Sequence, residues 1–166
     1  MLMIFDKLGD IDFRQLMDVY SESNIISGDK YYRKYPKNLR ILYAEQDFYN
    51  NLVLFFKEPS ARYAVWNLEG RYTAALRTER YSDGLLITAL ETAPDQRCKG
   101  IASMLMTAVL EHLKTVGNGR LYSHVDKDNE ASLAAHARCG FRIMSDLAVY
   151  LDGTVVTNAY TLCKEY

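Results

Sequence analysis

The fold of this chain is decided by residues 90–102, which read LETAPDQRCKGIA. The apolar stretch that leads into this segment has the length of a strand and ends before Pro94. The spacing of apolar residues after the loop predicts an uninterrupted helix from Ile101 to Val116. Gly100 opens that helix, where a residue without a side chain lets a ligand approach the backbone. A helix N-terminus offers unpaired N–H groups and about half a positive charge. The segment therefore predicts a strand–loop–helix unit that binds an anion.

Two basic side chains support the prediction of an anion site. Arg97 and Lys99 lie in the loop and supply positive charge for a phosphate group. The alternative is a plain strand–loop–helix connection with two solvated basic residues. The chain contains neither GxxxxGK[ST] nor GxGxxG, which excludes a P-loop nucleotide site and the dinucleotide-binding fingerprint. The loop therefore predicts a phosphate or pyrophosphate site of another kind.

Three strands are expected immediately before this loop. They cover residues 61–68, 71–78 and 85–92, and the turns between them are Glu69-Gly70 and Ser82-Asp83-Gly84. Apolar and polar residues alternate along the second strand, which is typical of a strand buried on one face. Consecutive strands joined by tight turns predict an antiparallel meander.

Helices are expected nearer the N-terminus, after a short strand at residues 1–5. The first begins after Asp10 or Asp12 as N-cap and ends before Gly28. The second covers residues 39–56, where apolar residues recur at helical spacing.

Shorter elements follow the long helix. A strand is expected at 121–125 and a helix at 131–138, and residues 141–151 and 154–163 flank an Asp152-Gly153 hairpin turn. The last of these strands could be an edge strand that pairs with a second copy of the chain. The whole order of elements predicts a mixed α/β sheet domain.

Composition limits the class of protein. The 166 residues are 49% hydrophobic and 25% charged, which predicts one globular domain over residues 1–166. Twenty basic and 21 acidic residues leave a net charge of −1, which argues against nucleic-acid binding through bulk charge. No apolar run approaches the ~20 residues of a membrane span, and the N-terminus lacks the features of a signal peptide. We therefore expect a cytoplasmic protein that does not bind a membrane.

Cysteine and histidine spacing predicts no metal site. Cys98, Cys139 and Cys163 are far apart in sequence, and the three histidines follow one another at intervals of 12 residues. Zinc sites need closely spaced Cys and His ligands, and paired helical ligands are four residues apart. The cysteines are expected to be reduced thiols.

Two segments of the chain resemble one known family. Residues 97–102, RCKGIA, match the R/Q-x-x-G-x-G/A signature of the GNAT superfamily of acetyl-CoA-dependent N-acetyltransferases. Residues 129–141, NEASLAAHARCGF, look like that family's later N-x-x-A/S…Y/H-x-x-x-G-F segment. With the meander before and the hairpin after, the resemblance covers roughly residues 61–163. It implies a GNAT-like α/β (α+β) fold with a mixed, mostly antiparallel central sheet of six to seven strands flanked by about four helices.

The resemblance implies acetyl-CoA as the acetyl donor, and no metal. In similar proteins the signature loop binds the pyrophosphate and the preceding strand binds the pantetheine arm. The implied cofactor-binding residues are Leu90, Glu91, Thr92, Arg97, Cys98, Lys99, Gly100, Ile101, Ala102 and Asn129. Asn129 is alternatively the N-cap of the short helix. The cofactor strand and the 121–125 strand are expected to splay apart, and the amine to attack the thioester directly, without an acyl-enzyme.

The chemistry needs a base for the amine and an acid for the leaving thiolate. Glu91 is the first candidate for the base, because strand alternation places it on the other face from Leu86 and Thr88. Glu45 is the second candidate, and water is the third. The family commonly has a tyrosine as the acid at the position of His136, and a histidine can also donate a proton. The alternative for His136 is a partly exposed histidine without a catalytic role.

The acceptor is the least specified part of the prediction. Tyr31 and Tyr32, in a tyrosine-rich segment, are candidates for an aromatic wall of the acceptor site together with Glu45, although surface or core packing is the commoner explanation for such tyrosines. Aminoglycosides, polyamines, amino acids, peptide N-termini and lysine side chains all remain open as amine acceptors. Two rival functions are also open: a non-catalytic acyl-CoA sensor and an interaction domain without a ligand.

Overall fold

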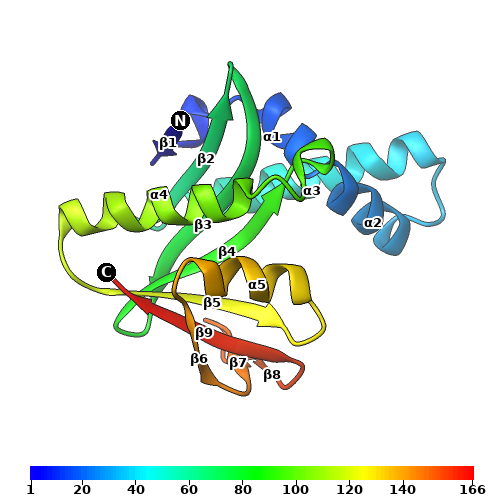
Figure 1. Ribbon diagram of the computed structural model, residues 1–166. Coiled ribbons are helices and arrows are strands. Elements are labelled where there is room, and N and C mark those ends of the chain that lie inside the picture. Colours follow the sequence, from blue (N-terminus) through cyan, green and yellow to red (C-terminus); the bar gives the residue numbers. More distant parts are fainter.

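A seven-stranded sheet forms the centre of the computed structural model, which describes residues 1–166. The strand order is β1-β2-β3-β4-β5-β9-β6, and all neighbours are antiparallel except β4 and β5. The strands are β1 (Leu2–Phe5), β2 (Arg62–Leu68), β3 (Arg71–Tyr81), β4 (Gly84–Thr92), β5 (Arg120–Asp126), β6 (Arg142–Ser145) and β9 (Ala159–Glu165). The predicted mixed, mostly antiparallel sheet is confirmed (Figure 1).

Five α-helices flank the sheet, where about four were expected. They are α1 (Phe13–Val19), α2 (Ser21–Tyr31), α3 (Lys37–Phe55), α4 (Ile101–Val116) and α5 (Glu130–Arg138). The bounds of α4 are those that the sequence predicts. Figure 1 shows α4 and α5 in front of the sheet and α3 behind it. None of the helices has the length and apolar character needed to cross a membrane.

The first predicted helix is in fact two helices that meet at Tyr20. The predicted N-cap Asp12 is confirmed, since its carboxylate accepts a hydrogen bond of 3.1 Å from the Gln15 amide. The chain bends at Tyr20 and turns this side chain into the sheet, where only 3% of it is exposed. The bend separates α1, which packs on β3, from α2, which packs mainly on α3.

The sequence predicted that a helix ends before Gly28, but Gly28 lies inside α2. A Cβ atom at Gly28 would lie 2.8 Å from the carbonyl oxygen of Arg40 in α3. The prediction is wrong because the missing side chain serves packing between two helices, not helix termination. The α2–α3 hairpin can therefore close tightly.

Strand β3 is buried on both faces, not on one as its alternation predicted. All residues from Tyr72 to Leu76 are buried. On the front face, Ala74 and Leu76 pack in one core with α4. On the back face, Tyr72 and Ala75 pack in a second core with α1 and α3. The prediction fails because helices from distant parts of the sequence cover both faces.

The predicted C-terminal hairpin is broken into two pieces. Its turn at Asp152-Gly153 is present, with Gly153 at φ +83°, but each arm joins the main sheet only at the end far from the turn, the first through β6 and the second through β9. The middle of the hairpin forms a separate ribbon of β7 (Ala148–Val149) and β8 (Val155–Val156). Strand β9 is not an edge strand, because it lies between β5 and β6. The hypothesis that this strand pairs with a second copy is therefore wrong: both of its sides are already hydrogen-bonded.

Candidate functional site

The parallel strands β4 and β5 separate halfway along their length. They pair at only three positions, of which the last joins Ile87 to Ser123. Beyond that pair, a bulge interrupts β4: three residue steps on β4 oppose two on β3, and Ala89 has φ +51°. An extra residue bends a strand and ends its pairing. The predicted splay between the two strands is thus present, and it opens the sheet at the bulge.

Two buried tyrosines hold the bulge. Tyr20 donates its hydroxyl proton to the carbonyl of Ala89, and Tyr63 donates to the Tyr20 hydroxyl at 2.9 Å. Burial raises the pKa of both phenols, so both stay protonated and can donate. In a trans peptide the C=O and the next N–H point in opposite directions. Anchoring the Ala89 carbonyl on the back face therefore directs the Leu90 N–H away from Tyr20.

The bulge also corrects the predicted orientation of Glu91. Glu91 pairs with Ala75, and Thr88 pairs with Arg77. Ala75 belongs to the core on the back face, and Arg77 stacks on Phe55 of that same face. Glu91 therefore lies on the same face as Thr88, not on the opposite one. The simple alternation fails because the extra residue shifts the register by one.

A cleft lies between the end of β4, the following loop and the start of α5. Its volume is about 660 Å³. Its walls include Leu90, Glu91, Thr92, Arg97, Cys98, Gly100, Ile101, Ala102, Asn129 and Ser132. Nine of the ten residues predicted to bind the cofactor thus line a single cleft, and only Lys99 does not.

The loop before α4 has the geometry of an anion site. Gly100 is the N-cap of α4 at φ +76°, and the space around its missing Cβ is open. Lys99 and Arg97 follow the short 3-10 helix Pro94–Gln96, and Lys99 donates to the Gln96 side chain at 3.2 Å. A helix N-terminus in open space beside two cations favours a bound anion.

Arg97 pairs with two carboxylates, Glu22 of α2 and Glu91 of β4. Its guanidinium donates to Glu22 at 2.5 Å and to Glu91 at 3.4 Å. Ser23 donates to the second oxygen of Glu91 at 2.6 Å. Burial raises the pKa of Glu91, and the hydrogen bond from Ser23 opposes this shift. The loop and α2 are thus joined by a small polar network at the rim of the cleft.

Asn129 and His136 hold the two ends of α5. Asn129 is the N-cap, since its side chain accepts from the Ser132 amide at 3.0 Å. His136 is only 1% exposed, so the alternative of a partly exposed histidine is wrong. Its Nδ1 lies 2.8 Å from the Ser132 carbonyl, which can only accept, so Nδ1 carries the proton. Its Nε2 is buried without a partner, and burial lowers its pKa.

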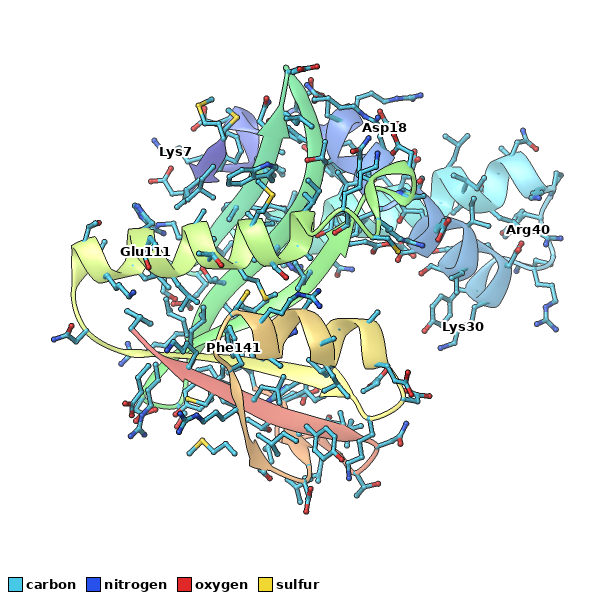
Figure 2. All side chains as sticks on the ribbon, in the orientation of Figure 1. Lys7, Asp18, Lys30, Arg40, Glu111 and Phe141 are labelled. Carbon is cyan, nitrogen blue, oxygen red and sulfur yellow. The ribbon has the colours of Figure 1, made fainter.

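The predicted acceptor residues lie apart from the cleft. Tyr31 ends α2, and Tyr32 follows it, donating its hydroxyl proton to Asp47 and stacking on Tyr43 at 5.1 Å. Figure 2 shows the neighbouring labelled residue Lys30 at the outer end of the α2–α3 hairpin, away from the start of α4. Glu45 lies along α3 and does not line the cleft either. None of these three side chains lines the cleft.

His124 is a candidate that the sequence did not single out for catalysis. One step beyond the last β4–β5 pair, His124 on β5 stands across the opening from Thr88 on β4. Its Nε2 lies 3.3 Å from the Tyr81 hydroxyl, and its Nδ1 is buried without a partner. Burial lowers its pKa, so the imidazole is neutral at pH 7. The signal in the sequence was a histidine within the apolar strand 121–125, but its position opposite Thr88 depends on the parallel register.

The comparisons with known proteins agree with the geometry. A model of the acetyltransferase (GNAT) family matches residues 16–141. No curated protein matches the sequence significantly. No group of three or more His, Cys, Asp or Glu side chains could hold a metal ion.

Solved structures share the fold at low sequence identity. The PaiA N-acetyltransferase of Thermoplasma acidophilum, in complex with coenzyme A, has a TM-score of 0.66 at 13% identity, covering 100% of this chain and 99% of that one. The ribosomal-protein-S18-alanine N-acetyltransferase of Escherichia coli has a TM-score of 0.64 at 17% identity, covering 99% and 94%. An aminoglycoside 6'-N-acetyltransferase in complex with coenzyme A has a TM-score of 0.62 at 12% identity, covering 99% and 96%.

Proposed function

The chain belongs to the GNAT acetyltransferase family, and from this premise we propose that it transfers the acetyl group of acetyl-CoA directly to a primary amine of a small molecule or peptide. One observation carries the proposal: the parallel strands β4 and β5 open beyond Ile87 and Ser123, beside the anion-binding start of α4. An opening of this kind gives a thioester a path through the sheet. A cytoplasmic location belongs to the same proposal.

The donor would lie in the cleft with its pyrophosphate on the amides at the start of α4. Gly100 leaves room for this approach, and Lys99 adds positive charge. Arg97 could join them after leaving Glu22 and Glu91. The pantetheine arm would bind along Leu90–Thr92 in the manner of an added strand.

The thioester carbonyl would be polarised by an amide at the bulge. The Leu90 N–H is the candidate, because Tyr20 and Tyr63 fix the peptide to which it belongs. A well-placed donor of this kind contributes about 2.7–4 kcal/mol to lowering the barrier. The amine nitrogen then attacks the carbonyl carbon and coenzyme A leaves as a thiolate.

We propose that His124 is the base that takes a proton from the ammonium group of the acceptor, so that the neutral amine can attack. It is neutral, it stands at the opening, and its buried Nδ1 has no other partner. Glu91, predicted from the sequence, is the competing candidate, but Ser23 and Arg97 occupy its two oxygens. A base must reach the proton that it removes, directly or through one water. Substituting each residue by glutamine separates the two assignments.

The alternative function is a non-catalytic acyl-CoA sensor of the same fold. Both functions require the cleft, but only the enzyme needs His124 and an acceptor site. Steady release of coenzyme A in the presence of a defined amine distinguishes them.

The first test is a thermal melt with acetyl-CoA, coenzyme A or ATP. A ligand at one hundred times its Kd stabilises the folded state by about 2.7 kcal/mol, which at this chain length shifts Tm by roughly 5–10 °C. We expect this shift with acetyl-CoA and coenzyme A and little shift with ATP. The second step measures coenzyme A release with a panel of amines. No shift at millimolar acetyl-CoA contradicts the proposal, and a shift without release under any amine favours the sensor.

A further inference from the structure

A second hollow lies on the back face of the sheet, opposite α4. It is a cavity of about 290 Å³ between α3 and β3, lined by Phe48, Asn51, Phe55, Arg77 and Glu79. A neighbouring cavity of about 440 Å³ shares Phe55 and Glu79 with it, so the two adjoin. Small-molecule sites commonly enclose about 300–1,000 Å³. The volume suits a molecule of the size of an amino acid.

Arg77 presents an unpaired cation to this hollow. Its guanidinium stacks on the Phe55 ring at 5.2 Å from the centroid, which fixes its plane. Its Nε is buried and has no hydrogen-bond partner, and no salt bridge involves this residue. A planar guanidinium fork matches a carboxylate in shape and charge. A carboxylate in the hollow would satisfy the buried donor.

Glu79 presents the opposite charge two residues along the same strand face. It also forms no salt bridge, and its side chain accepts from the Thr88 hydroxyl at 3.3 Å. Thr88 directly precedes the bulge residue Ala89 and stands across the opening from His124. The backbone of Glu79 pairs with Leu86 in the closed part of the sheet, but this hydrogen bond brings its carboxylate to Thr88, at the edge of the opening. An ammonium group held there would lie beside the proposed base.

We infer that the acceptor is a small amino carboxylate, such as a free amino acid, with its carboxylate on Arg77 and its amine at Glu79. This inference rests on the proposed acetyl transfer and names its substrate class. Residues i and i+2 of a strand lie about 6.6 Å apart on one face, which suits two charged groups separated by a few bonds. Phe48 and Phe55 provide apolar walls for the carbon atoms between or beside them.

The same charges disfavour the other classes of acceptor. A polyamine or an aminoglycoside would bring further cations against Arg77, and an amine without a carboxylate would leave its buried Nε unsatisfied. A lysine side chain of a folded protein or the N-terminus of a long peptide carries no carboxylate at this distance. The inferred site should therefore accept a free amino acid in preference to an amine that lacks a carboxylate.

The test offers each amino acid in three forms: the free acid, the carboxamide and the decarboxylated amine. Initial rates of coenzyme A release give kcat/KM, and melts of the coenzyme A complex with each compound report binding without turnover. We expect wild type to prefer the free acid over the carboxamide about tenfold or more. Arg77→Gln should bring this ratio close to one. The ratio is internal to each variant, so a partly folded sample does not change it.

A matched control and the outcomes complete the design. Arg14→Gln makes the same chemical change at an exposed residue of α1 and should keep the wild-type ratio. Equal rates and equal binding for acid and carboxamide in wild type would overturn the inference, as would an unchanged preference in Arg77→Gln. If coenzyme A is released equally with amines of every kind, the proposed acetyl transfer still holds and only the inferred substrate class is wrong. Failure to bind acetyl-CoA would instead count against the proposed function.

Discussion

The two faces of the sheet differ in how far the sequence reveals them. The front face carries the cleft of the proposed acetyl donor, and ten of the residues that line it come from one continuous stretch of chain, residues 90–103. The back face carries the hollow beside α3, whose lining residues 48, 51, 55, 77 and 79 belong to two separate elements. Figure 1 shows α4 in front and α3 behind, with β3 and β4 between them. A site built from neighbouring residues can be predicted from the sequence, whereas a site built by packing between distant elements can be found only in the structure.

The largest expected effect is that of replacing His124, the proposed base at the opening of the sheet. His124→Gln keeps a polar side chain but removes the proton acceptor, and we expect kcat to fall by about 10²–10⁴-fold with the acetyl-CoA Kd unchanged. In wild type, kcat should rise with pH and reach a plateau by neutral pH, because burial lowers the pKa of His124 from its ordinary value of 6.5. Steady-state rates and titrations across pH measure both effects.

Two variants serve as controls for His124→Gln. His112→Gln changes an exposed histidine of α4 and should leave kcat unchanged. Glu91→Gln should lower kcat much less than His124→Gln does. If Glu91→Gln alone abolishes turnover, then Glu91 is the base, as the sequence predicted.

A smaller effect is expected from the tyrosine that connects the back face to the front. Tyr20→Phe removes the hydroxyl that holds the Ala89 carbonyl, and we expect kcat to fall about tenfold, about 1.4 kcal/mol in the barrier. The affinity for coenzyme A should not change. Tyr63→Phe should have a weaker effect in wild type and none in the Tyr20→Phe background, since Tyr63 acts through Tyr20. Additive effects of the two changes would contradict this chain of contacts.

A change on the back face alone should spare the donor site. Gly28→Ala places a methyl group 2.8 Å from the Arg40 carbonyl and should destabilise the fold by about 1–3 kcal/mol. Acetyl-CoA affinity should remain that of wild type, while KM for the amine rises because α3 shifts. Gly9→Ala, where the added group meets nothing within 4 Å, is the matched control. A loss of acetyl-CoA affinity in Gly28→Ala would show that the two faces are not independent.

The smallest catalytic effect is expected at His136. The proton on Nδ1 is donated to the Ser132 carbonyl, so His136→Phe should change kcat by less than about threefold. Its effect should appear in stability. Burial lowers the pKa of His136 in the folded state, so its contribution is complete above pH 6.5 and is lost as pH falls below that value. Melts between pH 5 and 8 should show a flatter pH dependence for the variant. A hundredfold fall in kcat would instead assign His136 as the acid.

The sequence predicted those features that depend on neighbouring residues. The N-cap Asp12, the bounds of α4 and the Gly70 turn follow from local patterns, and nine of the ten residues that the resemblance assigned to the cofactor line one cleft. Three failures share one cause, which is packing between distant segments. Gly28 makes room for α3, β3 receives helices on both faces, and β9 inserts between β5 and β6.

The orientation of the side chains at the end of β4 depends on a single extra residue. Because of the bulge at Ala89, Glu91 lies on the same face of β4 as Thr88. No local sequence pattern predicts this bulge. His124 gains its position only from the parallel pairing of β4 with β5. The tyrosine-rich segment was a candidate for the acceptor site because of its composition, yet it lies at the outer end of the α2–α3 hairpin. Arg77 looked like an ordinary polar residue of an alternating strand, and Glu79 lay just beyond the predicted strand 71–78.

The most direct test of the central claim is a calorimetric titration of acetyl-CoA into wild type, Gly100→Glu and Gly153→Glu. Both glycines have positive φ and open space at the missing Cβ, so both changes cost the fold similar strain, but only Gly100 lies in the cleft. We predict one acetyl-CoA per chain with equal affinity for wild type and Gly153→Glu, and at least hundredfold weaker binding for Gly100→Glu. Equal affinity in all three proteins would contradict the assignment of this cleft to the acetyl donor.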